Sequence, residues 1–294
     1  MKMRNRLFGS LCLLAATVIW GSAFVAQSVG MDHIGPFTFQ AIRCALAALG
    51  LLPLIFAFDK GKDFLKKWKD KQLWLAGILC AVPLFLAVNL QQVGIVTAGA
   101  GKSAFLTAMY IVLVPVLGAM LGKKQSPMVP VSVVLGVLGL YLLSCAGVTQ
   151  VEPGDLLLIG CALMFAVQIL FVDRFAPTVD PLRLNCIQSG LCAIGSAIVM
   201  LFTEEPTWQT VSQCAIPLGY AGFLSMGLAY SLQIVGQKHL ESAVASLLMS
   251  LESVFAVFFG WLLLHETMSA PEAAGCVLML LAVILSQIPA KARA

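Results

Sequence analysis

Ten long apolar stretches follow one another along this chain, each 17 to 23 residues long and separated by short polar connections. About 20 helical residues span the hydrocarbon core of a bilayer. Only 11% of the 294 residues are charged and 60% are hydrophobic, whereas a soluble domain carries about 25% charged residues. The composition therefore excludes a single water-soluble core and predicts an all-α integral membrane protein with ten transmembrane helices. The predicted spans are 7–28, 36–58, 73–92, 99–121, 128–146, 156–172, 184–202, 215–236, 242–264 and 271–288.

Basic residues give the predicted orientation of these spans. If the spans alternate in direction, the connections on one side, together with both termini, hold 16 of the 18 lysines and arginines, and the opposite connections hold none. Lysine and arginine accumulate in cytoplasmic loops. We therefore predict a multi-pass protein of the inner or plasma membrane with cytoplasmic N- and C-termini. The stretch 7–28 is too long for the apolar region of a signal peptide, so we expect it to remain as a helix.

The chain repeats itself at an offset of 142 residues. Residues 86–94 (LAVNLQQVG) match residues 228–236 (LAYSLQIVG) at six of nine positions. Five spans per half is an odd number, so the second half must enter the membrane from the side opposite to the first. We predict two inverted five-helix repeats, residues 1–147 and 148–294. Such repeats support alternating access around a site near the bilayer midplane, which favours a transporter.

Four segments carry a family resemblance: 15–24 (AATVIWGSAF), 39–43 (FQAIR), 246–255 (SLLMSLESVF) and 261–266 (WLLLHE). In this order they resemble the EamA-like transporters of the drug/metabolite transporter superfamily, over essentially the whole chain. The resemblance implies two five-helix repeats and secondary-active export of metabolites, amino acids or drugs, with proton exchange as one form of coupling. The family usually has proline where this chain has Ser253, and glycine where it has His265. The first departure leaves a helix kink open but keeps the carboxylate of Glu252.

Apart from Glu272 at the very start of the last span, three charged residues fall inside the predicted spans: Arg43, Lys102 and Glu252. Each costs at least ~2.5–3.5 kcal/mol at the centre of a bilayer, so each is a candidate for function. Glu252 lies about 15 Å into its span, too deep for a short side chain to reach water. We expect it to face a central cavity and to bind a proton or a substrate amine. A protonated acid that bonds to a neighbouring helix is the alternative.

Arg43 and Lys102 lie in the outer half of the membrane, because their spans are predicted to begin on the outer side. Arg43 lies about 10–12 Å deep and suits structural pairing and the binding of a substrate carboxylate equally well. The equivalent place in the second half holds Gln188. We expect Lys102, one turn into its span, to extend outward to water, with a gate contact to an anionic substrate group as the alternative. A central acid with basic groups toward the outer side suits a zwitterion.

Uncharged polar and aromatic residues inside the spans complete the candidate pathway. Amides within spans usually bond to neighbouring helices, and aromatic residues far from the interfaces pack in the core or line a cavity. We also expect Pro53, Pro83 and Pro115 to break helices near that cavity. The candidates for the substrate or proton pathway are Glu252, Arg43, Lys102, Trp20, Asn89, Gln91, Tyr110, Gln168, Gln188, Tyr230 and Gln233.

One connection, 61–71, has a pattern of its own. Phe64, Leu65 and Trp68 share one helical face among lysines, which is typical of a short helix on an anionic leaflet. A solvated basic loop fits the pattern equally well.

The sequence carries no motif for catalysis or for a cofactor. It has no HExxH, P-loop, GxSxG or dinucleotide-binding fingerprint, and its nine scattered cysteines form no CxxC pair. We therefore expect no enzyme activity, cofactor, metal site or nucleic-acid partner. The expected partners are a small-molecule substrate, the lipid bilayer and protons, with a homodimer as a further option. A lipid flippase, a membrane-embedded enzyme and a scaffold are the alternative functions.

Overall fold

The computed structural model describes residues 2–59, 64–98, 100–123, 125–144, 152–264 and 269–288, and this part of the chain contains helices but no strand. The prediction of an all-α protein is thus confirmed. Eight helical segments are long and apolar enough to cross a membrane, and two further apolar helices, Val129–Leu143 and Ala270–Ser286, are shorter. Eight of the ten predicted spans therefore meet the length criterion, and the complete set of ten stays a prediction.

Proline helps to set where several of these helices begin. α2, α8, α9 and α15 each carry a proline at one of their first two positions. At the start of a helix the backbone N–H has no intrahelical acceptor, so proline, which has no N–H, loses no hydrogen bond there. The elements are α1 (Lys2–Gly30), α2 (Pro36–Phe58), α3 (Phe64–Lys67), α4 (Lys71–Ala98), α5 (Ala100–Ala108), α6 (Tyr110–Met120), α7 (Val129–Ser144), α8 (Pro153–Phe175), α9 (Pro181–Thr203), α10 (Trp208–Gln213), α11 (Ala215–Gly219), the π-helix η1 (Tyr220–Ala229), α12 (Tyr230–Gln237), α13 (Ser242–Met249), α14 (Glu252–Leu264) and α15 (Ala270–Ser286).

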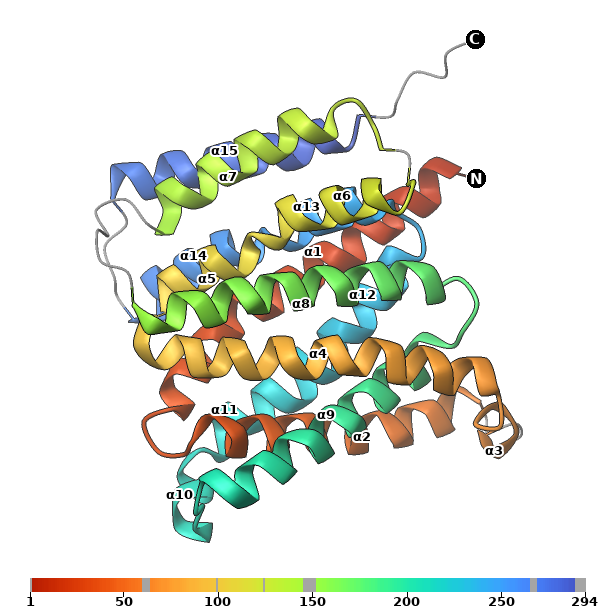
Figure 1. Ribbon diagram of the computed structural model, residues 1–294, viewed down its shortest axis with the longest axis vertical. Coiled ribbons are helices and arrows are strands. Elements are labelled where there is room, and N and C mark those ends of the chain that lie inside the picture. Colours follow the sequence, from red (N-terminus) through yellow and green to blue (C-terminus); the bar gives the residue numbers. More distant parts are fainter. Residues whose placement is uncertain are drawn as a thin grey trace.

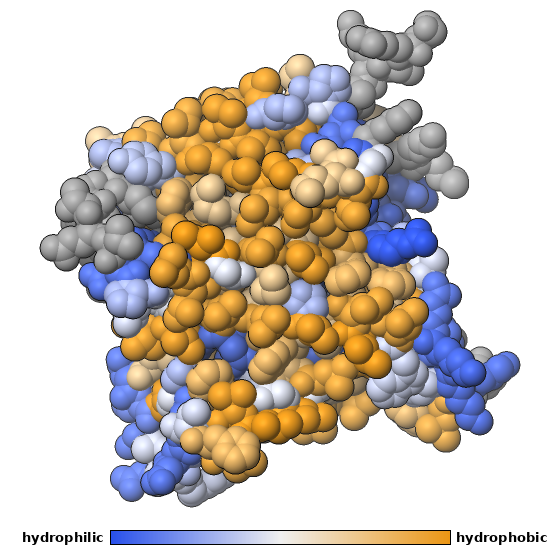
Figure 2. All heavy atoms as spheres, viewed as in Figure 1, coloured by the Kyte–Doolittle hydropathy of each residue, from blue (hydrophilic) through white to orange (hydrophobic). Residues whose placement is uncertain are grey.

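The long helices run roughly side by side, so their ends gather at two opposite edges of the molecule (Figure 1). Figure 2 shows hydrophobic residues over the middle of the visible face and hydrophilic ones along those two edges. Many large apolar side chains are exposed, among them Leu49, Phe56, Val82 and Ile198. An apolar belt between two polar edges is the surface that a bilayer requires.

Helices from the two halves of the chain pack against each other. α2 lies along α9, α4 along α8 and α7 along α15, while α1 contacts η1 and α12–α14 (Figure 1). Glycines allow two of these pairs to approach closely: a Cβ added at Gly139 would lie 2.9 Å from the carbonyl oxygen of Gly275, and one at Gly154 would lie 2.8 Å from that of Gly94. Small residues serve this purpose in membrane helix pairs.

Helix interruptions occur at different residues from those predicted. Pro53, Pro83 and Pro115 lie inside α2, α4 and α6, so the expectation that they break helices was wrong. The breaks fall instead at Met109, between α5 and α6, and at residues 250–251, between α13 and α14. The second break directly precedes Glu252 and forms without the proline that the family usually has there.

The connection 61–71 is only partly helical in the structure. α3 covers four residues, and residues 60–63 lie outside the described part. Phe64 and Trp68 pack against the apolar cores of the bundle, whereas Leu65 is exposed. The three side chains therefore do not share one outward apolar face, because two of them are held by the protein itself.

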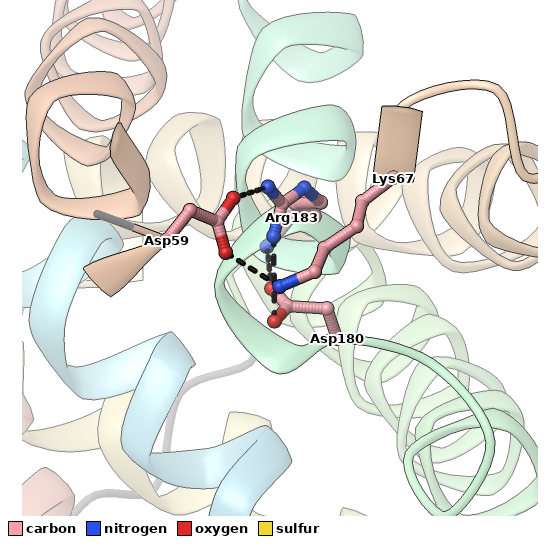
Figure 3. Close-up of polar contacts among 4 residues, drawn as sticks. All are labelled: Asp59, Lys67, Asp180 and Arg183. Carbon is pink, nitrogen blue, oxygen red and sulfur yellow. Dashed lines mark hydrogen bonds and ion pairs between the residues drawn. The ribbon is translucent and has the colours of Figure 1, made fainter. Parts of the chain in front are cut away.

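An ion-pair cluster joins this connection to α2 and α9 (Figure 3). Arg183, whose side chain is 1% exposed, pairs with Asp59 at the end of α2 and, at 3.5 Å, with Asp180. Lys67 Nζ donates to Asp59 Oδ1 at 2.6 Å. The guanidinium also lies 5.6 Å from the ring centroid of Trp68. These contacts tie the C-terminus of α2 to the first turn of α9.

Asp59 makes stability depend on pH. Hydrogen bonds from Lys67 and Arg183 lower the pKa of its carboxyl group. Folding that lowers a carboxyl pKa stabilises the protein above the unfolded pKa, about 3.9 for aspartate, and this contribution is lost as pH falls through the lower, folded value. We expect Asp59→Asn to lower the thermal midpoint near neutral pH, and this effect to shrink as the pH falls below about 4 and to vanish only below the lower, folded pKa.

Thermal unfolding of the purified protein across that pH range measures this effect. Asp70→Asn is the matched control, because Asp70 is exposed and its contact, to the backbone N–H of Gln72, can be made by asparagine as well. A difference in thermal midpoint between wild type and Asp59→Asn that stays constant with pH would contradict the lowered pKa of Asp59.

Candidate functional site

A cavity lies in the middle of the bundle. Its walls come from α1, α2 and α4, and also from α6, α8, η1 and α12–α14, so both halves of the chain contribute. The lining residues are Trp20, Phe24, Gln27, Arg43, Gln91, Tyr110, Phe165, Ile169, Ser225, Tyr230, Gln233, Met249 and Glu252.

Three of the lining residues directly follow a helix break or a change from π-helix to α-helix. Tyr110 and Glu252 are the first residues after the breaks that precede α6 and α14, and Tyr230 is the first residue after the π-helix η1. Irregular backbone inside a membrane protein is tolerated where it lines a cavity, and π-helical turns occur frequently at functional sites. The interruptions therefore mark the cavity in the backbone as well as in the side chains.

Glu252 is a buried carboxylic acid on the cavity wall, with 7% of its surface exposed. Its Oε1 accepts a hydrogen bond from Tyr110 Oη at 3.0 Å, and among the described residues no lysine, arginine or histidine forms an ion pair with it. Its place in the first turn of α14 favours a negative charge there. The group can thus hold a proton or accept hydrogen bonds from a cationic solute.

Arg43 lies on the wall of the same cavity and is 2% exposed. Its Nε donates to Gln40 Oε1 at 2.6 Å and its Nη1 to Gln27 Oε1 at 2.7 Å. Both partners are neutral amides, and in the described chain no carboxylate lies within ion-pair distance of the guanidinium. A buried charge is costly without a counter-charge. The cavity therefore contains an arginine whose positive charge suits an anionic group of a ligand.

Aromatic rings and amides complete the walls. The rings of Trp20 and Tyr230 meet edge to face with centroids 5.0 Å apart, and those of Tyr110 and Phe165 at 6.4 Å. Gln91 Nε2 donates to a threonine hydroxyl at 3.3 Å. Such walls combine apolar contact with a few fixed polar groups, as binding sites for small organic molecules do.

The structure brings together seven of the eleven predicted pathway residues. Besides the two charged groups, these are Trp20, Gln91, Tyr110, Tyr230 and Gln233. The other four do not line the cavity. Gln168 accepts a hydrogen bond from Gln233, and Gln188 donates one to Asn185. Asn89 bonds to Ser196, and Lys102 forms an ion pair with Asp155.

The position of Lys102 differs from its prediction. Its Nζ lies 2.6 Å from Asp155 Oδ2, and the two side chains are largely buried. A contact between α5 and α8 thus replaces the expected extension to water. The sequence could not indicate this pairing, because the two residues belong to different halves of the chain.

Six lining residues were missed. Gln27 could have been found as a polar residue inside the first predicted span, whereas the others follow no sequence signal. They are Phe24, Phe165, Ile169, Ser225 and Met249. Metal ligation gains no support: the described residues contain no group of three potential ligands, and eight cysteines are free. The ninth, Cys145, lies outside the described residues, as does His265.

Comparison with known proteins defines the class of this chain. The sequence model of the EamA-like transporter family matches residues 7–145 and again residues 152–287. The chain therefore belongs to the EamA-like transporter family, and it is a multi-pass membrane transporter.

Individual relatives agree with this class. The chain is 31% identical over 282 residues to an uncharacterized transporter of Archaeoglobus fulgidus, and the aligned region covers 96% of this chain and 86% of the relative. It is 28% identical over 281 residues to the threonine/homoserine exporter RhtA of Escherichia coli, with 88% and 84% covered. A solved crystal structure shares the fold, with a TM-score of 0.80 at 17% identity over 95% of this chain and 96% of the other.

Proposed function

We propose that this transporter exports a small zwitterionic solute of the amino-acid type, with Glu252 binding its amine and Arg43 its carboxylate. The observation that carries this proposal is the presence of an acid and a guanidinium on one cavity without an ion pair between them. A zwitterion supplies both missing counter-charges, and charged hydrogen bonds contribute about 1.5–3 kcal/mol each. The name of the relative RhtA, an exporter of threonine and homoserine, supports the same class of solute.

The mechanism that we propose is alternating access between two inverted repeats of five helices each, residues 1–147 and 148–294. The two separate matches to the family support this division. The last residues of the two helix breaks, Met109 and Leu251, also stand 142 residues apart, the offset of the sequence repeat. The residues that follow them, Tyr110 and Glu252, bond to each other, as equivalent residues do when they meet at a two-fold axis.

Equivalent contacts in α2 and α9 support the repeats further. Arg43 donates to Gln40, three residues before it, and Gln188 donates in the same way to Asn185. The residues that end the two helices are also equivalent.

These end residues are acids, and each binds the first turn of the other helix. Asp59, after α2, pairs with Arg183 of α9. Glu204, after α9, accepts hydrogen bonds from the backbone N–H groups of Phe37 and Thr38 in α2 at 2.9 and 2.8 Å.

We further propose that the edge of the molecule with Arg4, Lys66, Lys123 and Lys238 faces the cytoplasm, in accordance with the positive-inside rule. Arg6 bonds to the backbone of Gln287 at 3.4 Å, so the start of α1 and the end of α15 lie at that same edge. Proton exchange at Glu252 is the coupling that we propose. The homodimer stays a prediction.

Thermal unfolding with matched solutes tests the proposal. L-threonine has both charges, its methyl ester lacks the carboxylate, and N-acetyl-threonine lacks the amine. A solute at about 100 times its Kd stabilises the protein by ~2.7 kcal/mol, so we expect threonine or another free amino acid to raise the midpoint more than either of its derivatives.

The other outcomes of this experiment are equally informative. Stabilisation by organic cations alone would contradict the zwitterion and indicate drug export with Glu252 as the counter-charge. If no free amino acid binds or is transported, the proposal is wrong, and scrambling of labelled lipid in vesicles then tests the flippase.

A further inference from the structure

A second hollow lies at the basic edge of the molecule. It is lined by Lys123, Asp173, Lys238, His239 and Glu241, at the ends of α6 and α8 and in the connection from α12 to α13. α6, α8, α12 and α13 also line the central cavity. The same four elements therefore lead from the cavity to this hollow.

Three buried glutamines lie along these elements, and we call them the glutamine cluster: Gln168 of α8 with Gln233 and Gln237 of α12. Gln233 Nε2 donates to Gln168 Oε1 at 3.1 Å and to Gln237 Oε1 at 2.9 Å. Gln237 Nε2 donates to the backbone oxygen of Ile169 at 3.0 Å. Gln233 lines the cavity, and Lys238, next to Gln237, lines the hollow. The cluster thus stands between the two spaces.

The cluster leaves hydrogen-bonding capacity unused. Gln168 Nε2 and Gln233 Oε1 are buried without a hydrogen-bond partner in the part of the chain that the structure describes. An unpaired buried polar atom costs about 1–3 kcal/mol, and apolar side chains of similar size would close this space without that cost. The two atoms are therefore available to polar partners such as water or the polar groups of a solute.

We propose that the glutamine cluster is the inner barrier of the transport path. It closes the cavity toward the hollow in this structure, and its amides bind water and the polar groups of the solute when the path opens to that side. The inference rests on the proposed function, because it takes the central cavity as the solute site. Gln237 does not line the cavity, so it can alter passage without touching a solute bound there.

Accessibility to a membrane-impermeant cationic thiol reagent tests this barrier without any solute. The background is the chain with its nine cysteines replaced, and the reporter is Ser225→Cys on the cavity wall. Glu241→Cys, exposed at the hollow, identifies the membrane face from which the reagent reaches this edge. We expect Gln237→Ala to speed labelling of position 225 from that face about tenfold, as loss of its hydrogen bonds permits, and Gln237→Leu to slow it.

Controls separate the barrier from a general loosening of the bundle. Gln92→Ala removes a glutamine that is equally buried but lies outside both spaces, and it should leave the labelling rate unchanged. Gln237→Asn, checked for folding by its thermal midpoint, replaces the alanine variant if that one does not fold.

The possible results differ in what they overturn. Equal labelling in the folded Gln237 variants and the parent overturns the inner barrier, whatever solute the cavity binds. An absence of amino-acid binding with the expected labelling pattern overturns the proposed function and leaves the barrier in place.

Discussion

Replacing Glu252 with glutamine should abolish the proton-driven movement of L-threonine into vesicles that contain the purified protein. Glutamine keeps the size of the side chain and can still accept the hydrogen bond from Tyr110, but it can neither bind a proton nor carry a negative charge. Loss of one charged hydrogen bond, about 1.5–3 kcal/mol, weakens binding of the amine by roughly 10- to 150-fold. The measurement is uptake of labelled threonine with and without an imposed pH gradient.

Two variants show whether the effect belongs to the cavity. Glu205→Gln changes an exposed acid at the end of α9 and should leave uptake and its pH dependence as they are. Tyr110→Phe removes only the hydrogen bond to Glu252 and should give a smaller loss. If Glu252→Gln still transports threonine with the pH dependence of the wild type, Glu252 is not the coupling group.

Arg43→Gln should remove recognition of the solute carboxylate while leaving the fold intact. The equivalent position of α9 already holds a glutamine, which donates to Asn185 as Arg43 donates to Gln40, so the side chain fits its surroundings. We expect the affinity for threonine to fall by roughly 10- to 150-fold. The affinity for threonine methyl ester, which has no carboxylate, should change little.

The comparison between the two solutes separates a binding role from a structural one. If Arg43 only stabilises the helices, the variant loses affinity for both solutes in parallel with its thermal midpoint. Arg174→Gln, at an exposed position near the end of α8, controls for the loss of one positive charge. An unchanged affinity for threonine in Arg43→Gln would exclude the arginine from the site.

The sequence by itself determined that the chain is helical and lies in a membrane, because both properties depend on local composition. Hydropathy over about 20 residues reports whether a helix can span a bilayer, and the helix Pro36–Phe58 was predicted with its observed bounds. Charged residues inside a span are costly wherever the helix packs, so Arg43 and Glu252 could be singled out without a structure.

Only the tertiary structure decided which of these groups share a cavity and what each of them contacts. Tyr110 donates a hydrogen bond to Glu252, 142 residues further along the sequence. Lys102 forms an ion pair with Asp155 on another helix. The break before Glu252 follows no proline or glycine signal. Such features depend on how helices from the two halves pack, and a sequence pattern within one helix carries no information about its neighbours.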